Sequence, residues 1–454
     1  MADTAARAGE LDAGRTTAIR AAVAAADAGG VIALLDPLHP ADIADLIEQL
    51  SPPERRALLA LWGREIDGEI LSEIDEAIRE EVIETLAPEV LAEAVRELET
   101  DDVVDILEDL EEPAQERILE ALETADRAAV EQSLAYPDYS AGRLMQREVV
   151  TAPEHWTVGE AIDHLRGADW LPDQFYHVIL VDPRMRPVGY ATLGRILSAK
   201  RDTYLRDITE DTFRTIAATE PDAEVAYLFN QYHLISAPVV DEAGRLVGVI
   251  TIDDAMAVLD EEHEEDMLRL AGVGETASLS DGPVETVRLR LPWLIVNLGT
   301  ASLSAIVIAQ FEATIAALVT LAALMPIVAS TGGIAGTQSL AVAVRGLATR
   351  GLTSANARRV LLREIAAGLL NGLALAVVLG VAGWGIFGDP LLGAVLGGAM
   401  IVNQMVAATG GLLVPLALNR LGFDPALASG TFVTTLTDVM GFFAFLGLAT
   451  LILL

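Results

Sequence analysis

Five long apolar segments in the C-terminal part of the chain restrict its fold more than any other feature. They cover approximately residues 291–311, 313–344, 365–387, 391–417 and 426–454. Each provides the roughly 20 apolar residues that a helix needs to cross a bilayer. A helix satisfies its backbone polar groups within one segment, as the lipid interior demands. The sequence therefore predicts a transmembrane domain of five helices over residues 291–454.

The charged residues divide the chain into two parts of different character. The 454 residues have a formal net charge of −37, yet 61 of the 67 acidic and 22 of the 30 basic residues precede residue 285. An acidic part therefore precedes a nearly neutral membrane part. Phosphate binding needs a basic face, so this charge argues against a nucleic-acid partner and favours cations. The chain contains no cysteine, which excludes disulfides and thiolate metal sites.

The arginines of the membrane part indicate its orientation. They precede the first segment, fill the loop between the second and third, or follow the fourth, at positions 288, 290, 345, 350, 358, 359, 363 and 420. Positively charged loops stay in the cytoplasm. We therefore expect a multi-pass protein of the cell (inner) membrane, surrounded by lipid, with a cytoplasmic N-terminus and an extracytoplasmic C-terminus.

The acidic part begins with a predicted helical region. Residues 1–30 are rich in alanine, glycine and aspartate, and we expect them to be flexible. Residues 31–138 show apolar residues at helical spacing and contain an internal repeat. The segment "DIADLIEQLSPPERRALL" from Asp42 matches "DVVDILEDLEEPAQERIL" from Asp102 at an offset of 60 residues. Short helices repeated in this way predict a small helical solenoid.

Two copies of a strand–turn–strand–helix pattern follow the helical region. The segments are "FYHVILVDPRMRPVGYATLGRIL" and "ISAPVVDEAGRLVGVITIDDAMAVL", each with an aspartate in its turn. They resemble a tandem pair of α/β CBS domains, which we place at residues 139–203 and 204–262. Residues 263–290 are predicted to form a connecting helix that leads to the membrane. The predicted protein is therefore multidomain.

Asp438 is the most informative residue of the last apolar segment, "ASGTFVTTLTDVMGFFAFLGLATLILL". An ionised aspartate near the bilayer centre costs about 2.5–3.5 kcal/mol on insertion scales. One interpretation is a protonated side chain that bonds to a nearby threonine hydroxyl. We favour an ion pathway, because ionisable residues inside membranes usually mark one. In a two-fold dimer, two copies of Asp438 would form a ring of carboxylates suited to hydrated Mg²⁺.

The motifs of the membrane part resemble those of the MgtE family of magnesium channels. The similarity lies in "FDPALASGTFVTTLTDVMGFF", "RLRLPWLIVNLGTASLSA", "LMPIVASTGGIAGTQSLAVAVRGLA" and "LLREIAAGLLNG", and in the order of the domains. It covers about residues 30–454. The resemblance implies a homodimeric, Mg²⁺-selective channel whose cytosolic domains close the pore when intracellular Mg²⁺ is high. Ile334 departs from the asparagine that the family usually carries there, which bears on ion selectivity.

The resemblance also implies roles for individual acidic residues. Asp438 would hold the hydrated ion in the pore, and Asp424 would form a peripheral Mg²⁺ site near the cytosolic end of the last segment. Regulatory Mg²⁺ ions would bind at residues of the acidic part, namely Asp101, Asp105, Asp254, Glu262 and Glu265. Ala257 replaces an acid that family members often carry, which weakens one intersubunit site.

Several alternatives stay open. ATP binding by the CBS pair is open but unsupported: Thr251 and Asp254 alone are weak evidence for a ribose contact, and residues 193–196 depart from the Leu-Arg-Asp-Leu of nucleotide-binding relatives. The competing functions are transport of another divalent cation such as Co²⁺, an ion-coupled carrier, and a membrane-tethered CBS sensor without transport. We expect no enzyme, because the six histidines are scattered and neither a nucleophile motif nor a P-loop occurs.

Overall fold

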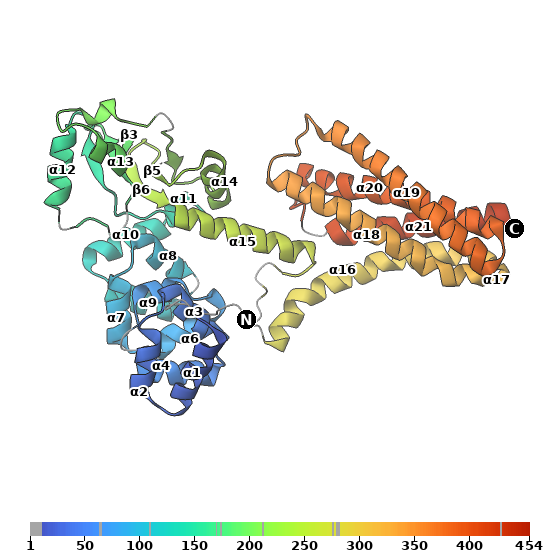
Figure 1. Ribbon diagram of the computed structural model, residues 1–454, viewed down its shortest axis with the longest axis horizontal. Coiled ribbons are helices and arrows are strands. Elements are labelled where there is room, and N and C mark those ends of the chain that lie inside the picture. Colours follow the sequence, from blue (N-terminus) through green and yellow to red (C-terminus); the bar gives the residue numbers. More distant parts are fainter. Residues whose placement is uncertain are drawn as a thin grey trace, which may run out of the picture. The chain divides into compact units, whose positions relative to one another are not determined.

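The computed structural model describes residues 11–62, 66–108, 110–168, 170–172, 175–210, 213–274, 277, 282–426 and 429–454. The chain divides into two compact units, residues 1–262 and 263–454 (Figure 1). The first unit contains short helices and two small sheets, whereas the described residues of the second are helices and their connections. The predicted fold class, a helical domain followed by an α/β pair and five long helices, is confirmed.

Short helices that share one apolar core form the first part of unit one. Their bounds are α1 (Ala13–Ala24), α2 (Ala28–Leu35), α3 (Pro40–Gln49), α4 (Pro52–Trp62), α5 (Gly68–Ser72), α6 (Glu76–Thr85), α7 (Pro88–Arg96), α8 (Thr100–Glu108), α9 (Glu112–Ala121) and α10 (Thr124–Leu134). The prediction of a flexible segment up to residue 30 is wrong for α1, because Ile19 and Val23 are buried in this core. Residues 1–10 lie outside the described part.

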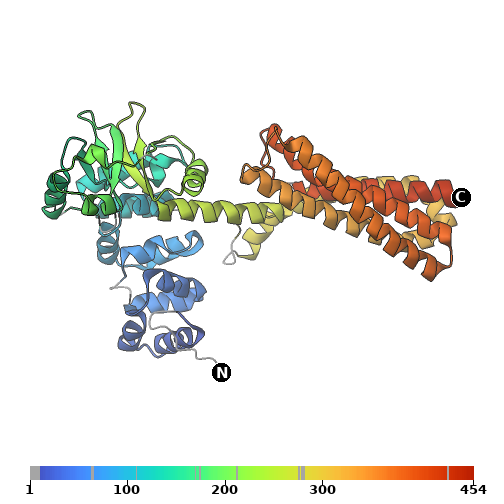
Figure 2. The ribbon, with the colours of Figure 1, turned by 45° about the horizontal axis from the view of Figure 1, so that its top comes forward.

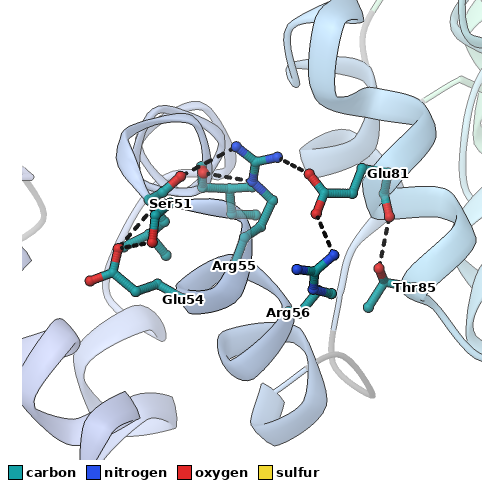
Figure 3. A network of polar contacts seen from close by, with 8 residues as sticks. Ser51, Glu54, Arg55, Arg56, Glu81 and Thr85 are labelled. Carbon is teal, nitrogen blue, oxygen red and sulfur yellow. Dashed lines mark hydrogen bonds and ion pairs between the residues drawn. The ribbon is translucent and has the colours of Figure 1, made fainter. Parts of the chain in front are cut away.

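The 60-residue repeat corresponds to two helix pairs, α3–α4 and α8–α9, that are closed by the same kind of contact. Arg55 on α4 donates to two carbonyl groups at the end of α3, and Gln115 on α9 donates to two at the end of α8. The acceptors are Ile47 and Leu50 and, 60 residues later, Leu107 and Leu110. Carbonyl groups at the end of a helix lack the N–H groups of a following turn, and these side chains supply donors in their place. Arg55 also reaches Glu81 of α6 at 2.5 Å (Figure 3).

The two strand–turn–strand–helix copies form two sheets with the same topology. In the first, β1 (Thr151–Pro153) pairs in parallel with β2 (His177–Val181), which pairs antiparallel with β3 (Pro187–Thr192). In the second, β4 (Ile216–Ala217), β5 (Ser236–Val240) and β6 (Leu246–Thr251) repeat this order. The accompanying helices are α11 (Ala141–Leu144), α12 (Val158–Arg166), α13 (Leu193–Ser198), the 3₁₀ turn η1 (Leu205–Asp207) and α14 (Asp222–Tyr232). The predicted pattern is confirmed in both copies.

An aspartate closes the hairpin turn of each copy. Asp182 and Asp241 accept hydrogen bonds from the backbone N–H groups two and four residues later, at 2.7 to 2.9 Å. The residue three positions after each aspartate has a positive φ, 58° at Met185 and 74° at Gly244. Glycine adopts this conformation readily, whereas a residue with a Cβ atom is strained. The two copies therefore share one turn geometry, but only the second copy has a glycine at the position with positive φ.

The connecting helix differs from its prediction over residues 263–290. Helix α15 (Ile252–Leu270) begins directly after β6, inside the predicted second CBS domain, and ends before Gly272, which has φ 72°. Helix α16 (Pro283–Gln310) then begins with a proline in its first turn, so residues 283–290 belong to the first long apolar helix. The prediction was wrong at these boundaries, because a left-handed glycine and a helix-starting proline interrupt the acidic pattern.

Unit two contains, among its described residues, five helices long and apolar enough to cross a membrane. They are α16, α18 (Thr320–Ala348), α19 (Ala357–Phe387), α20 (Pro390–Arg420) and α21 (Ser429–Leu453), with the short helix α17 (Glu312–Ala317) after the first. In Figure 2, α18 to α21 run side by side along the length of the unit. Helix α20 is buried between its neighbours, where glycines on α18 and α19 let the backbones approach closely.

Candidate functional site

The first turns of α8 and α15 bring together carboxylates that lie about 150 residues apart in the sequence. Helix α8 carries Asp101 and Asp102 in this turn, and α15 carries Asp253 and Asp254. The charge of Asp254 acts on Asp101, and that of Asp253 acts on Asp102. Asp101 is only 8% exposed. The structure thus unites Asp101 and Asp254, two residues that the sequence marked separately, in what we call the acidic junction (residues 99, 101, 102, 253 and 254).

Burial raises the pKa of carboxyl groups at the acidic junction. Burial, and then the Asp254 charge, raise the pKa of Asp101 well above its usual range. Burial raises the pKa of Asp254 to about 7 and that of Asp102 to about 6. Burial and the neighbouring charge of Glu148 raise the pKa of Glu99 to about 7. The junction is therefore incompletely ionised near neutral pH, and a cation that entered it would favour the charged forms.

Hydrogen bonds attach the start of α8 to the chain segment that precedes β1. The hydroxyl of Thr100 donates to Glu148 at 2.7 Å, and the side chain of Gln146 donates to Glu99. The predicted ligand Asp105, on the same helix, instead pairs with Arg79 of α6 at 2.9 Å and is 59% exposed. A guanidinium therefore already balances Asp105, whereas Asp101 and Asp254 face other carboxylates.

The acidic junction suits an ion that keeps part of its water shell. Within the described ranges, no three carboxylate or imidazole side chains are arranged as a ready metal-binding group. Mg²⁺ retains several of its own waters and is often held by one or two carboxylates. Two carboxylates, Asp101 and Asp254, are enough to hold such a hydrated ion, but too few to supply all the ligands of a dehydrated one. Their role as regulatory ligands stays a prediction.

The proposed nucleotide contacts lie beside a small cavity between the two sheets. Asp254 accepts hydrogen bonds from the Thr251 backbone N–H at 3.3 Å and from its hydroxyl at 2.6 Å. Thr251 lines a cavity of about 20 Å³, next to a hydrogen bond of 2.5 Å between His177 and Ser236. Ligand pockets usually measure roughly 300–1,000 Å³. ATP binding therefore stays a prediction that requires this cavity to widen.

Asp438 lies in the middle of α21 and is partly exposed. Two nearby threonine hydroxyl groups donate hydrogen bonds to backbone carbonyl groups of the same helix. Thr435 donates to the carbonyl of Thr431 at 2.7 Å, and Thr437 donates to that of Thr434 at 2.8 Å. A hydroxyl that donates in this way can still accept a hydrogen bond, so these contacts leave open the interpretation of Asp438 as a protonated group bonded to a neighbouring threonine. The role of Asp438 along an ion pathway stays a prediction.

Asn403 of α20 occupies the contact between α18 and α21, close to the turn that carries Asp438. It is fully buried, and its amide donates to the carbonyl of Val328 at 2.8 Å. A Cβ atom at Gly332 of α18 would lie 2.1 Å from the Asn403 side chain, and one at Gly441 of α21 would lie 2.9 Å from it.

The two neighbouring amides Asn403 and Gln404 of α20 therefore act in helix packing. Gln404 donates to the carbonyl of Thr331 on α18 at 3.3 Å and is 2% exposed. Both side chains are held inside the bundle, because α20 is buried between its neighbours. The glycines on facing helices were the only sequence signal for this role. Ile334, the departure from the family motif, is 59% exposed on α18.

Arg269 brings together two of the acids predicted to bind Mg²⁺. Its guanidinium lies 2.7 Å from Glu265 on α15 and 3.0 Å from Asp424 in the loop before α21. The Asp424 side chain also accepts a hydrogen bond from the Ala426 backbone at 2.7 Å. Glu262 lies one turn earlier on α15 and is partly buried. The metal-binding roles of these three acids stay predictions.

Comparisons with known proteins agree with this architecture. The model of the MgtE intracellular N domain matches residues 38–139, the CBS domain model matches residues 141–202 and 205–261, and the MgtE divalent cation transporter model matches residues 325–448. The magnesium transporter MgtE of Thermus thermophilus is 34% identical over 426 residues, which cover 92% of this chain and 94% of that protein. The chain belongs to the MgtE family. The resemblance inferred from its motifs is thereby confirmed.

Other members of the MgtE family extend the comparison. The magnesium transporter MgtE of Bacillus subtilis is 27% identical over 417 residues, which cover 92% of each protein. The solved cytosolic domain of the Mg²⁺ channel MgtE in complex with ATP is 31% identical, with a TM-score of 0.50, and covers 54% of this chain and 99% of that structure. Family membership and five spanning helices make this chain a multi-pass membrane protein of a cation transport family.

Proposed function

We propose that this chain transports Mg²⁺ selectively across the cell membrane as a homodimer. The observation that carries the proposal is Asp438, a carboxylate in the last spanning helix of a chain whose MgtE relatives are named magnesium transporters. Two copies of Asp438 across a dimer axis would give a carboxylate ring that attracts a hydrated divalent cation. The arginine-rich loops support a cytoplasmic N-terminus and an extracytoplasmic C-terminus.

Uptake into proteoliposomes tests the transport proposal directly. Wild-type protein and Asp438→Asn would be compared for Mg²⁺ and Co²⁺ uptake, because the amide keeps the size of the side chain and removes its charge. We expect Mg²⁺ uptake in the wild type and its loss in the variant. Equal Mg²⁺ and Co²⁺ uptake would favour a less selective transporter. No uptake by a folded dimer at low internal Mg²⁺ would favour a membrane-tethered sensor.

We further propose that cytosolic Mg²⁺ closes the pore through the acidic junction. Its carboxylates repel one another when ionised, and a divalent cation between Asp101 and Asp254 would hold α8 and α15 together. Mg²⁺ would then bind the closed arrangement more tightly than the open one, as a ligand-controlled equilibrium requires. The raised pKa values of about 7 at Glu99 and Asp254 imply that Mg²⁺ binding also releases protons.

Flux at different internal Mg²⁺ concentrations tests this gating. The double variant Asp101→Asn/Asp254→Asn should keep transporting at millimolar internal Mg²⁺ that closes the wild type. Asp126→Asn, an exposed acid of α10, is a control with the same kind of charge change. Equal wild-type flux at micromolar and at tens of millimolar internal Mg²⁺ would refute gating by this ion while leaving transport intact. Titration of the full-length protein with ATP would separately test the nucleotide prediction.

A further inference from the structure

Within unit two, the last turn of α15 is attached to the neighbouring helices by an apolar contact and an ion pair. Leu270 packs against a small buried cluster formed by Leu340 and Val344 of α18 and by Ala426. Beside this cluster, Arg269 pairs with Asp424, and the two side chains are 19% and 30% exposed. The attachment therefore joins the connecting helix to the loop that leads into α21, the helix of Asp438.

Three carboxylates surround this single guanidinium. Glu265 lies one turn before Arg269 on α15 and accepts its second bond at 2.7 Å. The adjacent Asp266 is close enough to interact with the charges of both Asp424 and Arg269. Without the guanidinium, Glu265, Asp266 and Asp424 would repel one another across the docking contact. Acids grouped in this way normally need a cation to approach so closely.

We propose that Arg269 is a resident cation, which takes the place of a divalent ion between α15 and the loop before α21. The consequence of this inference is that the attachment holds when Mg²⁺ is low. Only the importance of that consequence for gating rests on the proposed function. Arginine suits the task because its planar fork binds two carboxylates at once and stays charged at any physiological pH. The regulatory response to Mg²⁺ would then reside elsewhere, as at the acidic junction, and not at Asp424.

The absence of cysteine from the chain gives a direct test of docking. Cysteines introduced at Ala271 and Gly430 would report the attachment, because a Cβ atom at Gly430 would lie 3.5 Å from the Leu270 carbonyl oxygen. The rate of disulfide formation would be measured on the full-length protein in EDTA and in Mg²⁺. The readout requires no transport, so a failure of the transport proposal would be recognised separately by the absence of Mg²⁺ uptake.

The rate of disulfide formation should depend on Arg269 and not on an arginine elsewhere in the chain. With Arg269 present, the disulfide should form at the same rate in EDTA and in Mg²⁺. Arg269→Gln should slow it about fivefold in EDTA, with Mg²⁺ restoring the rate, as expected for the loss of a partly buried ion pair. Arg269→Lys should behave closer to the wild type, and Arg290→Gln, an exposed control, should have no effect. A wild-type rate that requires Mg²⁺, or an Arg269→Gln rate unchanged in EDTA, would overturn the proposal.

Discussion

The packing of Gly332 against Asn403 allows a sharp test of the membrane domain. An added Cβ atom at Gly332 would lie 2.1 Å from the Asn403 amide nitrogen and 2.7 Å from its carbonyl carbon. Both contacts are shorter than van der Waals distance, and Asn403 is fully buried and bonded to Val328. Overpacking of this kind costs roughly 1–3 kcal/mol. Gly332→Ala should therefore destabilise the protein by about that amount and push α18 away from α20.

The adjacent glycine provides a matched control. A Cβ atom at Gly333 would meet Thr434 at 3.8 Å, an ordinary contact, so Gly333→Ala should be tolerated. Asn403→Ala removes the atoms that clash and a buried hydrogen bond worth about 0.5–1.5 kcal/mol. The double variant Gly332→Ala/Asn403→Ala should then be more stable than the sum of the single changes predicts, by about 1 kcal/mol or more.

Thermal unfolding in detergent and Mg²⁺ uptake together decide this prediction. Tryptophan fluorescence would follow unfolding, and each kcal/mol corresponds to about 2–4 °C in a domain of this size. Uptake should fall with Gly332→Ala, because Asn403 also contacts the α21 turn at Gly441, three residues after Asp438. Equal effects of Gly332→Ala and Gly333→Ala, or strictly additive effects in the double variant, would refute the packing argument.

Two further predictions concern the sheets of unit one. Met185→Gly should stabilise the first copy by up to about 1 kcal/mol in chemical denaturation, since Met185 has φ 58°, whereas Gly244→Ala should destabilise the second by a similar amount. A destabilised Met185→Gly would show that methionine contacts outweigh the strain. Burial lowers the pKa of His177 to about 4 from 6.5, so the folded form binds fewer protons than the unfolded chain between these values. Wild-type stability relative to His177→Asn should therefore be constant above pH 6.5 and fall by about 3 kcal/mol as the pH drops to 4. A flat difference between the two proteins across this range would show that His177 is not held neutral.

The order of the domains and the number of spanning helices could be predicted from the amino-acid sequence alone. Helical and strand periodicities depend on neighbouring residues, so they could be recognised without tertiary contacts. The 60-residue repeat from Asp42 to Asp102 and the two hairpin copies were recognised for this reason. The boundaries were less certain, and α1 and the connecting helix were predicted incorrectly. The burial of Ile19 and the helix end before Gly272 depend on contacts and backbone angles that a composition does not specify.

Which acids lie together, and which are already paired with arginine, becomes visible only in the folded chain. Asp101, Asp105, Asp254, Glu265 and Asp424 look alike in the sequence, since nothing in the neighbouring residues shows which of these carboxylates is paired. Folding places Asp101 and Asp254 among other carboxylates at two helix starts, but places Asp105, Glu265 and Asp424 on arginine side chains. The energy of a charge depends on its distance to other charges and on its exposure to water, and the fold sets both quantities.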